Sequence, residues 1–258
     1  MNEHTIINPL LTDGSLFLSN ISVDNVIFGY HDKSLKVLLL HPTAIKKWAL
    51  PGGYIYKDET IENAAIRVAK DRTGLDNLYF KQCKFYSDPN RTKDEEFNTQ
   101  KLEDMTGYKL GKDHWIFNQH ISSCFYTLTD YSKVTPQGDY YASECLWFSI
   151  NDLPPLMFDH KKMIKDALDI LRIHLYHFPV GYELLPEKFT IPEIHSLYET
   201  LLNKSLDVRN FTKKLLKVGI VDKLDERKNI GAHRAPFLYK FNKDVYQDAL
   251  ENGMALFI

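Results

Sequence analysis

Charged side chains gather between residues 59 and 72, directly after a pair of glycines. Glu59, Glu62 and Asp71 supply carboxylates, and Arg67 and Arg72 add two fixed cations to the same stretch. Carboxylate oxygens are the ligands that magnesium prefers, and bound magnesium can support hydrolysis of phosphate compounds. A guanidinium at such a place repels the metal. The stretch therefore contains groups that favour metal-assisted hydrolysis and a group that opposes it.

The surrounding residues predict a strand end, a glycine loop and a helix that together position these charges. Pro51-Gly52-Gly53 favours tight or positive-φ conformations that close a loop. Thr60 can cap a helix, and Gly74 can end it. Apolar residues recur between them at helical spacing, at Ile61, Ala64, Ala65 and Val68.

This stretch resembles the Nudix box, whose family pattern is G-x5-E-x7-R-E-U-x-E-E-x-G-U, with U an aliphatic residue. Six residues fall in register with it, and Trp48-Ala-Leu-Pro-Gly-Gly matches the segment that usually precedes it. The six are Gly53, Glu59, Arg67, Ala69, Gly74 and Leu75. The resemblance implies that Glu59 and Arg67 pair and hold the glycine loop.

The three family glutamates that follow the arginine are replaced. In the family they hold the divalent metals that activate water against a diphosphate, but here the positions are Val68, Asp71 and Arg72. Val68 offers no oxygen ligand, Asp71 is a shorter acid than glutamate, and Arg72 is a cation. The resemblance therefore implies a Nudix domain that binds a ligand without hydrolysing it, with no catalytic residue, metal or cofactor. A hydrolase with substitute carboxylates at Glu59, Glu62 and Asp71 stays open as the alternative.

Composition limits the class of protein. The chain has 258 residues, of which 44% are hydrophobic, so it can bury one or two proper cores. Three separated cysteines, Cys83, Cys124 and Cys145, argue against a zinc site or a disulfide framework and favour the cytoplasm. No run approaches the ~20 apolar residues of a membrane span, and we expect no membrane association.

Apolar runs at 22–29, 35–40, 78–86, 114–128 and 144–150 predict strands. With the helix they predict an α+β fold, the α/β/α Nudix sandwich with a mixed sheet, over residues 1–153. Residues 92–113 are polar and resemble an insertion, a surface loop partly helical around 100–105, for which a functional role and disorder are both open. Consecutive prolines at 154–155 end this domain.

A connecting helix is predicted over 154–178, capped by Asp159 and running to about Tyr176 with an apolar face at Ile164, Leu168, Leu171 and Leu175. His160 begins it, and we interpret this residue as structural. His174 and His177 stand three apart without a further ligand nearby, so no metal site is predicted.

Residues 179–258 predict a second domain. Ile191–Leu202 forms one helix with an inner face of Ile194, Leu197, Tyr198, Leu201 and Leu202. Asp207 caps a second helix, Val208–Val218, with an apolar face of Val208, Phe211, Leu215 and Val218, and Gly219 ends it. Strands at 220–224 and 236–241 follow, and residues 244–258 form a short helix whose apolar end docks on its own domain. Helix, turn, helix and hairpin describe a winged helix-turn-helix.

Charge is segregated toward this domain. Residues 205–243 carry ten Lys and Arg against four Asp and Glu, whereas the rest of the chain carries 22 against 30. The outer face of the second helix would enter a major groove of double-stranded DNA, and the wing tip would touch the backbone. The helix residues are Arg209, Asn210, Lys213, Lys214 and Lys217, and the wing residues are Arg227, Lys228, His233 and Arg234.

Together the two domains resemble the Nudix-related transcriptional regulators, the NrtR type and their sugar-responsive relatives. The resemblance implies a homodimer that binds operator DNA and responds to a small-molecule effector, either ADP-ribose-like or a sugar such as arabinose. Tyr54, Tyr56, Tyr86 and Trp115 are the candidate effector-binding residues. Two alternatives stay open: a nucleotide-diphosphate hydrolase with an added nucleic-acid module, and a binding protein whose second domain joins another protein.

Overall fold

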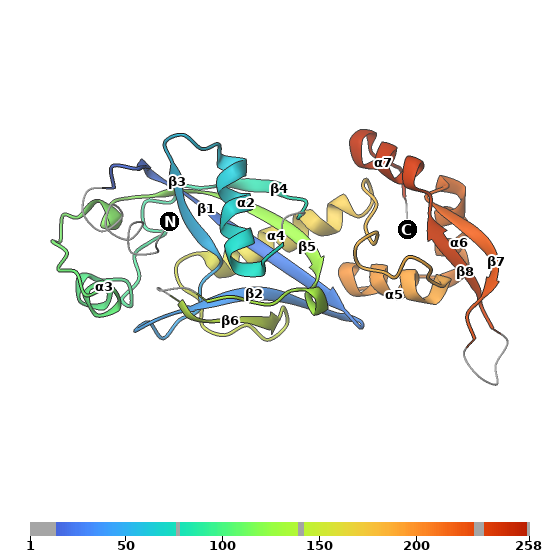
Figure 1. Cartoon of the computed structure of the whole chain (residues 1–258), viewed down its shortest axis with the longest axis horizontal. Coiled ribbons are helices and arrows are strands. Elements are labelled where there is room, and N and C mark those ends of the chain that lie inside the picture. Colours follow the sequence, from blue (N-terminus) through green and yellow to red (C-terminus); the bar gives the residue numbers. More distant parts are fainter. Residues whose placement is uncertain (1–13, 76–77, 139–141, 230–234, 257–258) are drawn as a thin grey trace. The chain divides into compact units, whose positions relative to one another are not determined.

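The structure is a computed structural model that describes residues 14–75, 78–138, 142–229 and 235–256. It divides into two compact units (Figure 1). Unit 1 comprises residues 1–29 and 36–167, and unit 2 comprises residues 30–35 and 168–258. The division at residue 167 falls inside the connecting helix that the sequence predicts over 154–178.

The described residues of unit 1 form a six-stranded sheet. Its strands run in the order β4-β5-β1-β2-β6, and β3 pairs with β1 beside this path. Their bounds are β1 (Phe17–His31), β2 (Ser34–Pro42), β3 (Gly52–Tyr56), β4 (Lys81–Tyr86), β5 (Ile121–Asp130) and β6 (Ala142–Ser149). The antiparallel register of β1 and β3 sets Asp24 opposite Gly52. This pairing places the Gly52-Gly53 segment against β1, the central strand of the sheet.

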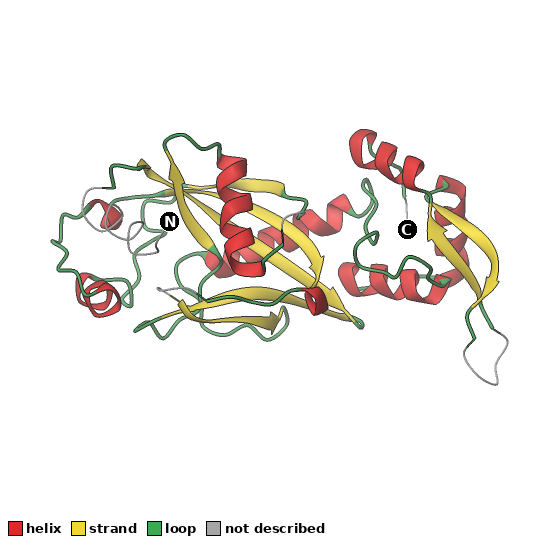
Figure 2. Cartoon of the chain, viewed as in Figure 1, coloured by secondary structure: helices red, strands yellow, loops and turns green. Residues whose placement is uncertain are grey.

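Two helices cover opposite faces of the sheet. Successive side chains of β1 alternate between these faces, so neighbouring residues of β1 contact different helices. Val23 packs with Ala65 of α2 (Ile61–Thr73), and Asn25 Nδ2 donates a hydrogen bond to the Ala65 carbonyl at 2.9 Å. Asp24 points to the other face, where its Oδ1 lies 3.7 Å from His160 Nε2 at the start of α4 (His160–His174). The predicted α/β/α sandwich is confirmed (Figure 2).

Helix α2 begins and ends where its cap signals predict. Thr60 Oγ1 accepts a hydrogen bond from Asn63 N at 3.2 Å, which satisfies an amide of the first turn. Gly74 adopts the left-handed conformation with φ 70°, and its N–H bonds to the Lys70 carbonyl. Both predicted termini are confirmed.

The glycine pair differs from the prediction in its backbone. Gly52 and Gly53 belong to strand β3 and are not among the described residues with positive φ. A Cβ atom at Gly52 would collide with the Asp24 carboxylate, and one at Gly53 would lie 2.8 Å from Val68 Cγ2. Lack of space, not an unusual backbone angle, requires glycine here.

The predicted insertion, residues 92–113, contains α3 (Thr99–Thr106), which confirms the expected helix near residues 100–105. Leu102 and Leu110 of this segment are buried with Ile116 in a small hydrophobic cluster, and Tyr54 packs against it. The strand predicted from residue 114 is wrong in its first part. Residues Trp115–Phe117 form a 3-10 helix, and β5 begins only at Ile121.

Helix α4 begins at His160, one residue after the predicted cap Asp159, and ends at His174, two residues earlier than predicted. Asp159 accepts the Met163 N–H through its backbone carbonyl. Its carboxylate is instead occupied by Arg91, with Asp159 Oδ1 2.9 Å from Arg91 Nη2. The predicted helix start is therefore confirmed, whereas the Asp159 side chain has another partner.

Unit 2 contains the predicted helix, turn, helix and hairpin. Its elements are α5 (Ile191–Leu202), α6 (Val208–Val218), β7 (Val221–Arg227), β8 (Phe237–Phe241) and α7 (Lys243–Asn252). The bounds of α5 and α6 match the prediction, and the predicted inner face of α5 is buried throughout. Tyr198 of α5 meets Phe211 of α6 with ring centroids 5.3 Å apart. Val208 was wrongly assigned to the apolar face of α6, since it is 50% exposed.

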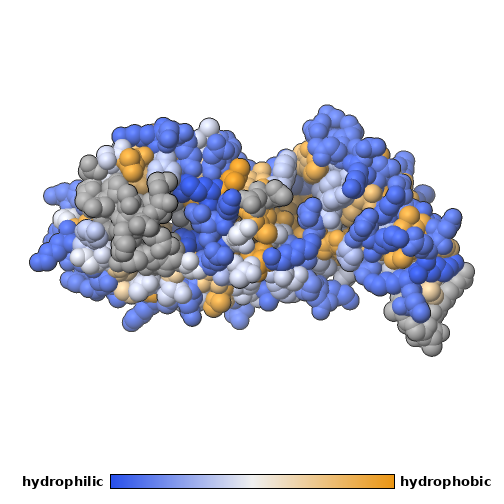
Figure 3. Space-filling model, viewed as in Figure 1, coloured by the Kyte–Doolittle hydropathy of each residue, from blue (hydrophilic) through white to orange (hydrophobic). Residues whose placement is uncertain are grey.

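The end of the chain packs within unit 2. Leu256 is fully buried, and its N–H donates to the Tyr176 carbonyl at 3.0 Å. This confirms the predicted docking for Leu256, whereas Phe257 and Ile258 lie outside the described residues. Hydrophilic side chains cover most of the visible surface, and hydrophobic residues gather there in small groups (Figure 3). Among the described residues, no helix combines the length and apolar character needed to cross a membrane.

Candidate functional site

A cavity of about 260 Å³ opens in unit 1 beside the two glycines of β3. Two arginines, Arg72 from the end of α2 and Arg91 from the loop after β4, line it. Hydrophobic and aromatic side chains form another part of the wall: Leu50, Tyr54, Phe97, Ile116 and Phe158. Cations beside aromatic rings are the combination that suits a phosphate joined to a planar base.

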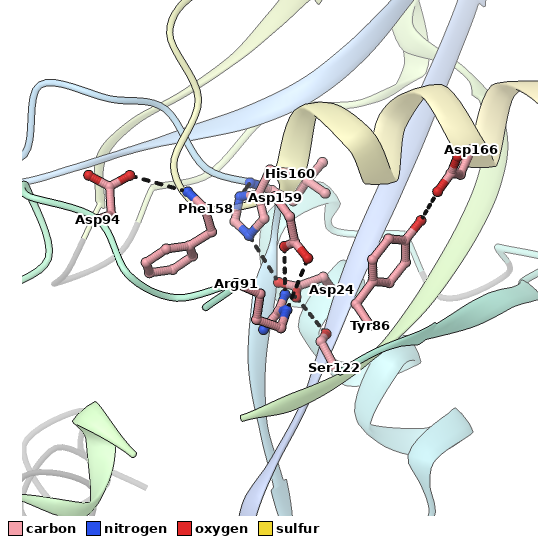
Figure 4. Close-up of polar contacts among 10 residues, drawn as sticks. Asp24, Tyr86, Arg91, Asp94, Ser122, Phe158, Asp159, His160 and Asp166 are labelled. Carbon is pink, nitrogen blue, oxygen red and sulfur yellow. Dashed lines mark hydrogen bonds and ion pairs between the residues drawn. The ribbon is translucent and has the colours of Figure 1, made fainter. Parts of the chain in front are cut away.

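A buried polar cluster lies at the wall of this cavity (Figure 4). Arg91 is its centre, with a side chain only 3% exposed. Its Nε and Nη2 donate to the two carboxylate oxygens of Asp159 at 3.1 and 2.9 Å, and Nη2 also lies 3.4 Å from Asp24 Oδ2. Ser122 Oγ donates to Asp24 Oδ2 at 2.5 Å. One guanidinium is thus shared by two carboxylates.

His160 completes the cluster as a neutral group. Its Nδ1 accepts the Leu50 N–H at 3.0 Å, which leaves the proton on Nε2, 3.7 Å from Asp24 Oδ1. Burial lowers the pKa of His160 below its ordinary value, more than the neighbouring Asp24 raises it. The cluster therefore carries one positive and two negative charges near neutral pH. His160 thus links the start of α4 to the Leu50 amide and also lines the cavity, so its structural role stays a prediction.

Glu59 and Arg67 form the predicted pair. Arg67 Nε and Nη2 donate to the two Glu59 oxygens at 2.7 and 2.8 Å, and Nη2 also donates to the Tyr54 carbonyl at 2.9 Å. Glu59 accepts the Tyr56 N–H at 3.1 Å. Burial alone would raise the pKa of Glu59, but the hydrogen bonds from Arg67 and Tyr56 lower it below its ordinary value. The pair ties the start of α2 to β3 beside the cavity.

The positions of the three missing glutamates do not fit a metal. Val68 is 4% exposed and packs in the hydrophobic core between α2 and β1. Asp71 is exposed, and Arg72 lines the cavity with a guanidinium. Within the part of the chain that the structure describes, no three His, Cys, Asp or Glu side chains are grouped as a metal site would need. At the three family positions this chain thus offers one carboxylate, that of Asp71.

Of the four aromatic residues predicted to bind an effector, Tyr54 lines this cavity and the others do not. Tyr56 stacks on Phe17 with ring centroids 5.0 Å apart, and Trp115 packs edge-on against Tyr54. Tyr86 donates its hydroxyl to Asp166 of α4 at 2.8 Å. Burial raises the pKa of Tyr86, so this hydroxyl stays protonated.

The sequence analysis did not assign Asp24, Arg91, Phe97 or Phe158 to the cavity. Their positions in the chain are far apart, and no spacing rule connects residues 24, 91 and 158. The one available signal was Asp159, the predicted cap of the connecting helix. It marked the helix and gave no indication that the cavity extends to it.

In unit 2 the outer face of α6 is exposed at Arg209, Asn210, Lys213 and Lys217, and Lys214 is half-buried. Phe211 and Leu215, 1% and 0% exposed, hold the opposite side in the core. Asp207 caps the helix by accepting the Asn210 N–H at 2.7 Å. The N-terminus of α6 and its cationic face are therefore both accessible to a partner.

The wing residues differ in what they contact. Arg227 lies over the Phe237 ring at 3.6 Å and donates to the Ala235 carbonyl. Lys228 is held by Glu193 of α5, with Nζ 2.6 Å from Oε1. His233 and Arg234, also predicted to touch DNA, lie outside the described residues. Lys228, which directly follows β7, is thus bound to α5.

Two family models match this chain. Residues 19–167 match the NUDIX domain, and residues 181–241 match the NrtR DNA-binding winged helix domain. The chain therefore belongs to the Nudix family. Its two domains define the class as a DNA-binding transcriptional regulator of the NrtR type, with a Nudix domain as the ligand-binding part.

The relatives include a transcriptional repressor and a hydrolase. The chain is 23% identical over 233 residues to the "ADPR responsive transcriptional repressor NtrR" of Acinetobacter baylyi, covering 88% of this chain and 83% of the relative. It is 32% identical over 151 residues to the ADP-ribose pyrophosphatase of Methanocaldococcus jannaschii, covering 57% and 72%. The crystal structure of Shewanella oneidensis NrtR has the same fold, with a TM-score of 0.67, 24% identity and coverage of 88% and 96%.

Proposed function

We propose that the Nudix domain binds an ADP-ribose-like nucleotide and does not hydrolyse it. Occupancy of the cavity then changes the affinity of the winged helix for operator DNA in a homodimer. The single observation that carries this proposal is Arg72, a guanidinium that lines the cavity where the family holds metal. It supplies the positive charge for a diphosphate without supplying the activated water of metal chemistry.

The wall of the cavity supports a nucleotide over a free sugar. Arg72 and Arg91 offer charge to a diphosphate, and Tyr54, Phe97 and Phe158 offer aromatic surface to a base. Phe97 and Phe158 already meet edge to face with centroids 5.1 Å apart. Two relatives are named for ADP-ribose or its hydrolysis. An uncharged pentose would bring neither a phosphate for the arginines nor a planar base for the aromatic wall.

The alternative is an active hydrolase, and the relative named as an ADP-ribose pyrophosphatase favours it. Its substitute carboxylates are poorly placed. Glu59 is engaged by Arg67 and the Tyr56 N–H, and Glu62 and Asp71 are exposed on α2. The charge at Arg72 opposes a cation at the remaining position.

Calorimetric titration of the full chain tests the proposal. We expect ADP-ribose to bind equally well with EDTA or magnesium, arabinose not to bind, and no AMP to form with magnesium. Arg72→Glu removes the cation and should weaken binding in EDTA about 10- to 100-fold, the range for a charge-assisted hydrogen bond in a partly buried site. Lys70→Glu, the same charge change on an exposed residue of α2, is the matched control.

Three results would reject the proposal. Magnesium-dependent AMP formation that disappears in Asp71→Ala would establish the hydrolase. Equal loss of binding in Arg72→Glu and Lys70→Glu would show that net charge, and not the cavity arginine, decides affinity. Binding of arabinose without ADP-ribose would assign the effector to the sugar class.

For the second unit, we propose that Arg209 and Asn210 reach base edges and that Lys213, Lys214 and Lys217 meet phosphates. The exposed face of α6 and the accessible first turn support this arrangement. A gel shift with the DNA that precedes the chain's own coding sequence is the direct test. Sedimentation of the free chain at micromolar concentration tests the homodimer.

A further inference from the structure

The buried cluster around Arg91 connects the cavity wall to the start of α4. Arg91 lines the cavity, and the same guanidinium binds Asp159 in the segment that leads into α4. Helix α4 spans the division between the two units, since residue 167 ends unit 1 and residue 168 begins the corresponding part of unit 2. Asp159 directly precedes the helix that continues into the DNA-binding unit.

The charges of the cluster oppose an anionic ligand as long as it stays closed. Arg91 carries one positive charge against Asp24 and Asp159, and His160 is neutral. A diphosphate that approaches Arg91 meets an excess of negative charge in a buried setting, where like charges repel strongly. One carboxylate must give up its place for the ligand to use this guanidinium.

Asp159 is the carboxylate that can leave. Asp24 lies within β1, and Ser122 and His160 hold it in the sheet core, with 10% of its side chain exposed. Asp159 precedes a helix and is 17% exposed, so its carboxylate can turn to solvent without breaking a strand. The two bonds to Arg91 are the ones that this movement would release.

The backbone beside Asp159 is held in an unusual conformation. Phe158 has φ 51°, a left-handed value that is rare for a bulky residue. Its N–H donates to Asp94 Oδ2 at 3.3 Å (Figure 4). Lys47 Nζ in turn lies 2.8 Å from Asp94 Oδ1. The bond from the Phe158 N–H to Asp94 and the bonds from Arg91 to the Asp159 carboxylate thus hold a strained segment in place. Losing one of them favours a different path into α4.

We infer that Arg91, beside Arg72, is a diphosphate-binding residue that couples ligand to helix, by exchanging its bonds with Asp159 for bonds to a ligand phosphate. This rests on the proposed nucleotide-binding function of the cavity. The ligand and Asp159 compete for one guanidinium, and the competition is reciprocal, since a chain that lacks the Asp159 charge binds the ligand more tightly. Neutral ligands of the same cavity do not enter this competition.

Asp159→Asn tests the competition, because it removes the charge and keeps the shape. We expect the full chain to bind ADP-ribose about tenfold more tightly by calorimetry, a coupling of ordinary size, and to bind adenosine unchanged. The matched control is Asp166→Asn, which removes a carboxylate of α4 that is bound to Lys84 at 2.6 Å and to Tyr86, away from the cavity lining. Its affinity for ADP-ribose should equal that of the parent chain.

Hydrogen exchange gives the structural readout. ADP-ribose should speed exchange of the amides of residues 158–163 in the parent chain, and Asp159→Asn should show fast exchange there without ligand. Equal or weaker ADP-ribose binding by Asp159→Asn, with the parent chain still binding, overturns the inference and leaves the proposed function in place. Tighter binding by Asp166→Asn as well overturns it in favour of general loosening of α4. A parent chain that binds no ADP-ribose rejects both proposals.

Discussion

The cationic face of α6 makes a quantitative prediction about salt. Lys213 and Lys217 are exposed one turn apart, on the side opposite the buried Phe211 and Leu215. In the double variant Lys213→Ala/Lys217→Ala, two phosphate contacts are lost. The slope of log Kobs against log salt should then fall in magnitude by about 1.8, because each contact to duplex DNA contributes about 0.9.

Fluorescence anisotropy with a random-sequence duplex, repeated between low and moderate salt, measures this slope without knowledge of the operator. Lys109→Ala/Lys112→Ala is the control, since both lysines are exposed in unit 1 and the change in net charge is the same. The variants are surface substitutions, so stability should change by less than about 0.5 kcal/mol each. An unchanged slope in the α6 variant, or an equal fall in the control, would refute the assignment of this face to DNA.

Three further predictions concern the supports of the two sites. Phe211→Ala should destabilise unit 2 by about 3–5 kcal/mol in urea unfolding, because a ring that is 1% exposed leaves a cavity. Asp207→Ala should cost about 1 kcal/mol, through loss of the α6 cap, and weaken DNA binding. Glu59 has a lowered pKa in the folded chain. Its contribution to stability is therefore complete above pH 4.5, its ordinary pKa, and is lost as the pH falls through the lower pKa of the folded state. Arg67→Met should remove this acid dependence from the unfolding midpoint.

The elements with local signals could be predicted nearly to the residue. Helix α6 lies between a capping Asp207 and a left-handed Gly219, and its observed bounds equal the predicted ones. Such signals depend on neighbours in the chain, so the sequence is sufficient. Val208 was misplaced because helical spacing gives a face and not its width, and only the packing of α5 on α6 decides where the buried stripe ends.

The cavity could not be predicted in the same way. Gly52 was expected to need a special backbone angle. Glycine is required there because the Asp24 carboxylate fills the space that a Cβ atom would take. That closeness depends on the register between β1 and β3. Arg91 reaches Asp159 across 68 positions of the chain. Contacts of this kind are fixed by strand pairing and by the loop after β4, for which the sequence offers no period. Arg72 was recognisable, because the family pattern defines what its position normally does.

Affinity and response are expected to oppose each other in this regulator. A ligand can shift an equilibrium only by its difference in affinity between the two states, so the cost of displacing Asp159 is also the source of the signal. Asp159→Asn should therefore bind ADP-ribose more tightly and yet change its DNA affinity less when the ligand is added. A gel shift with and without ADP-ribose measures that change. A variant that gained affinity and kept the full response would show that the signal leaves the cavity by a route other than the Arg91 bonds.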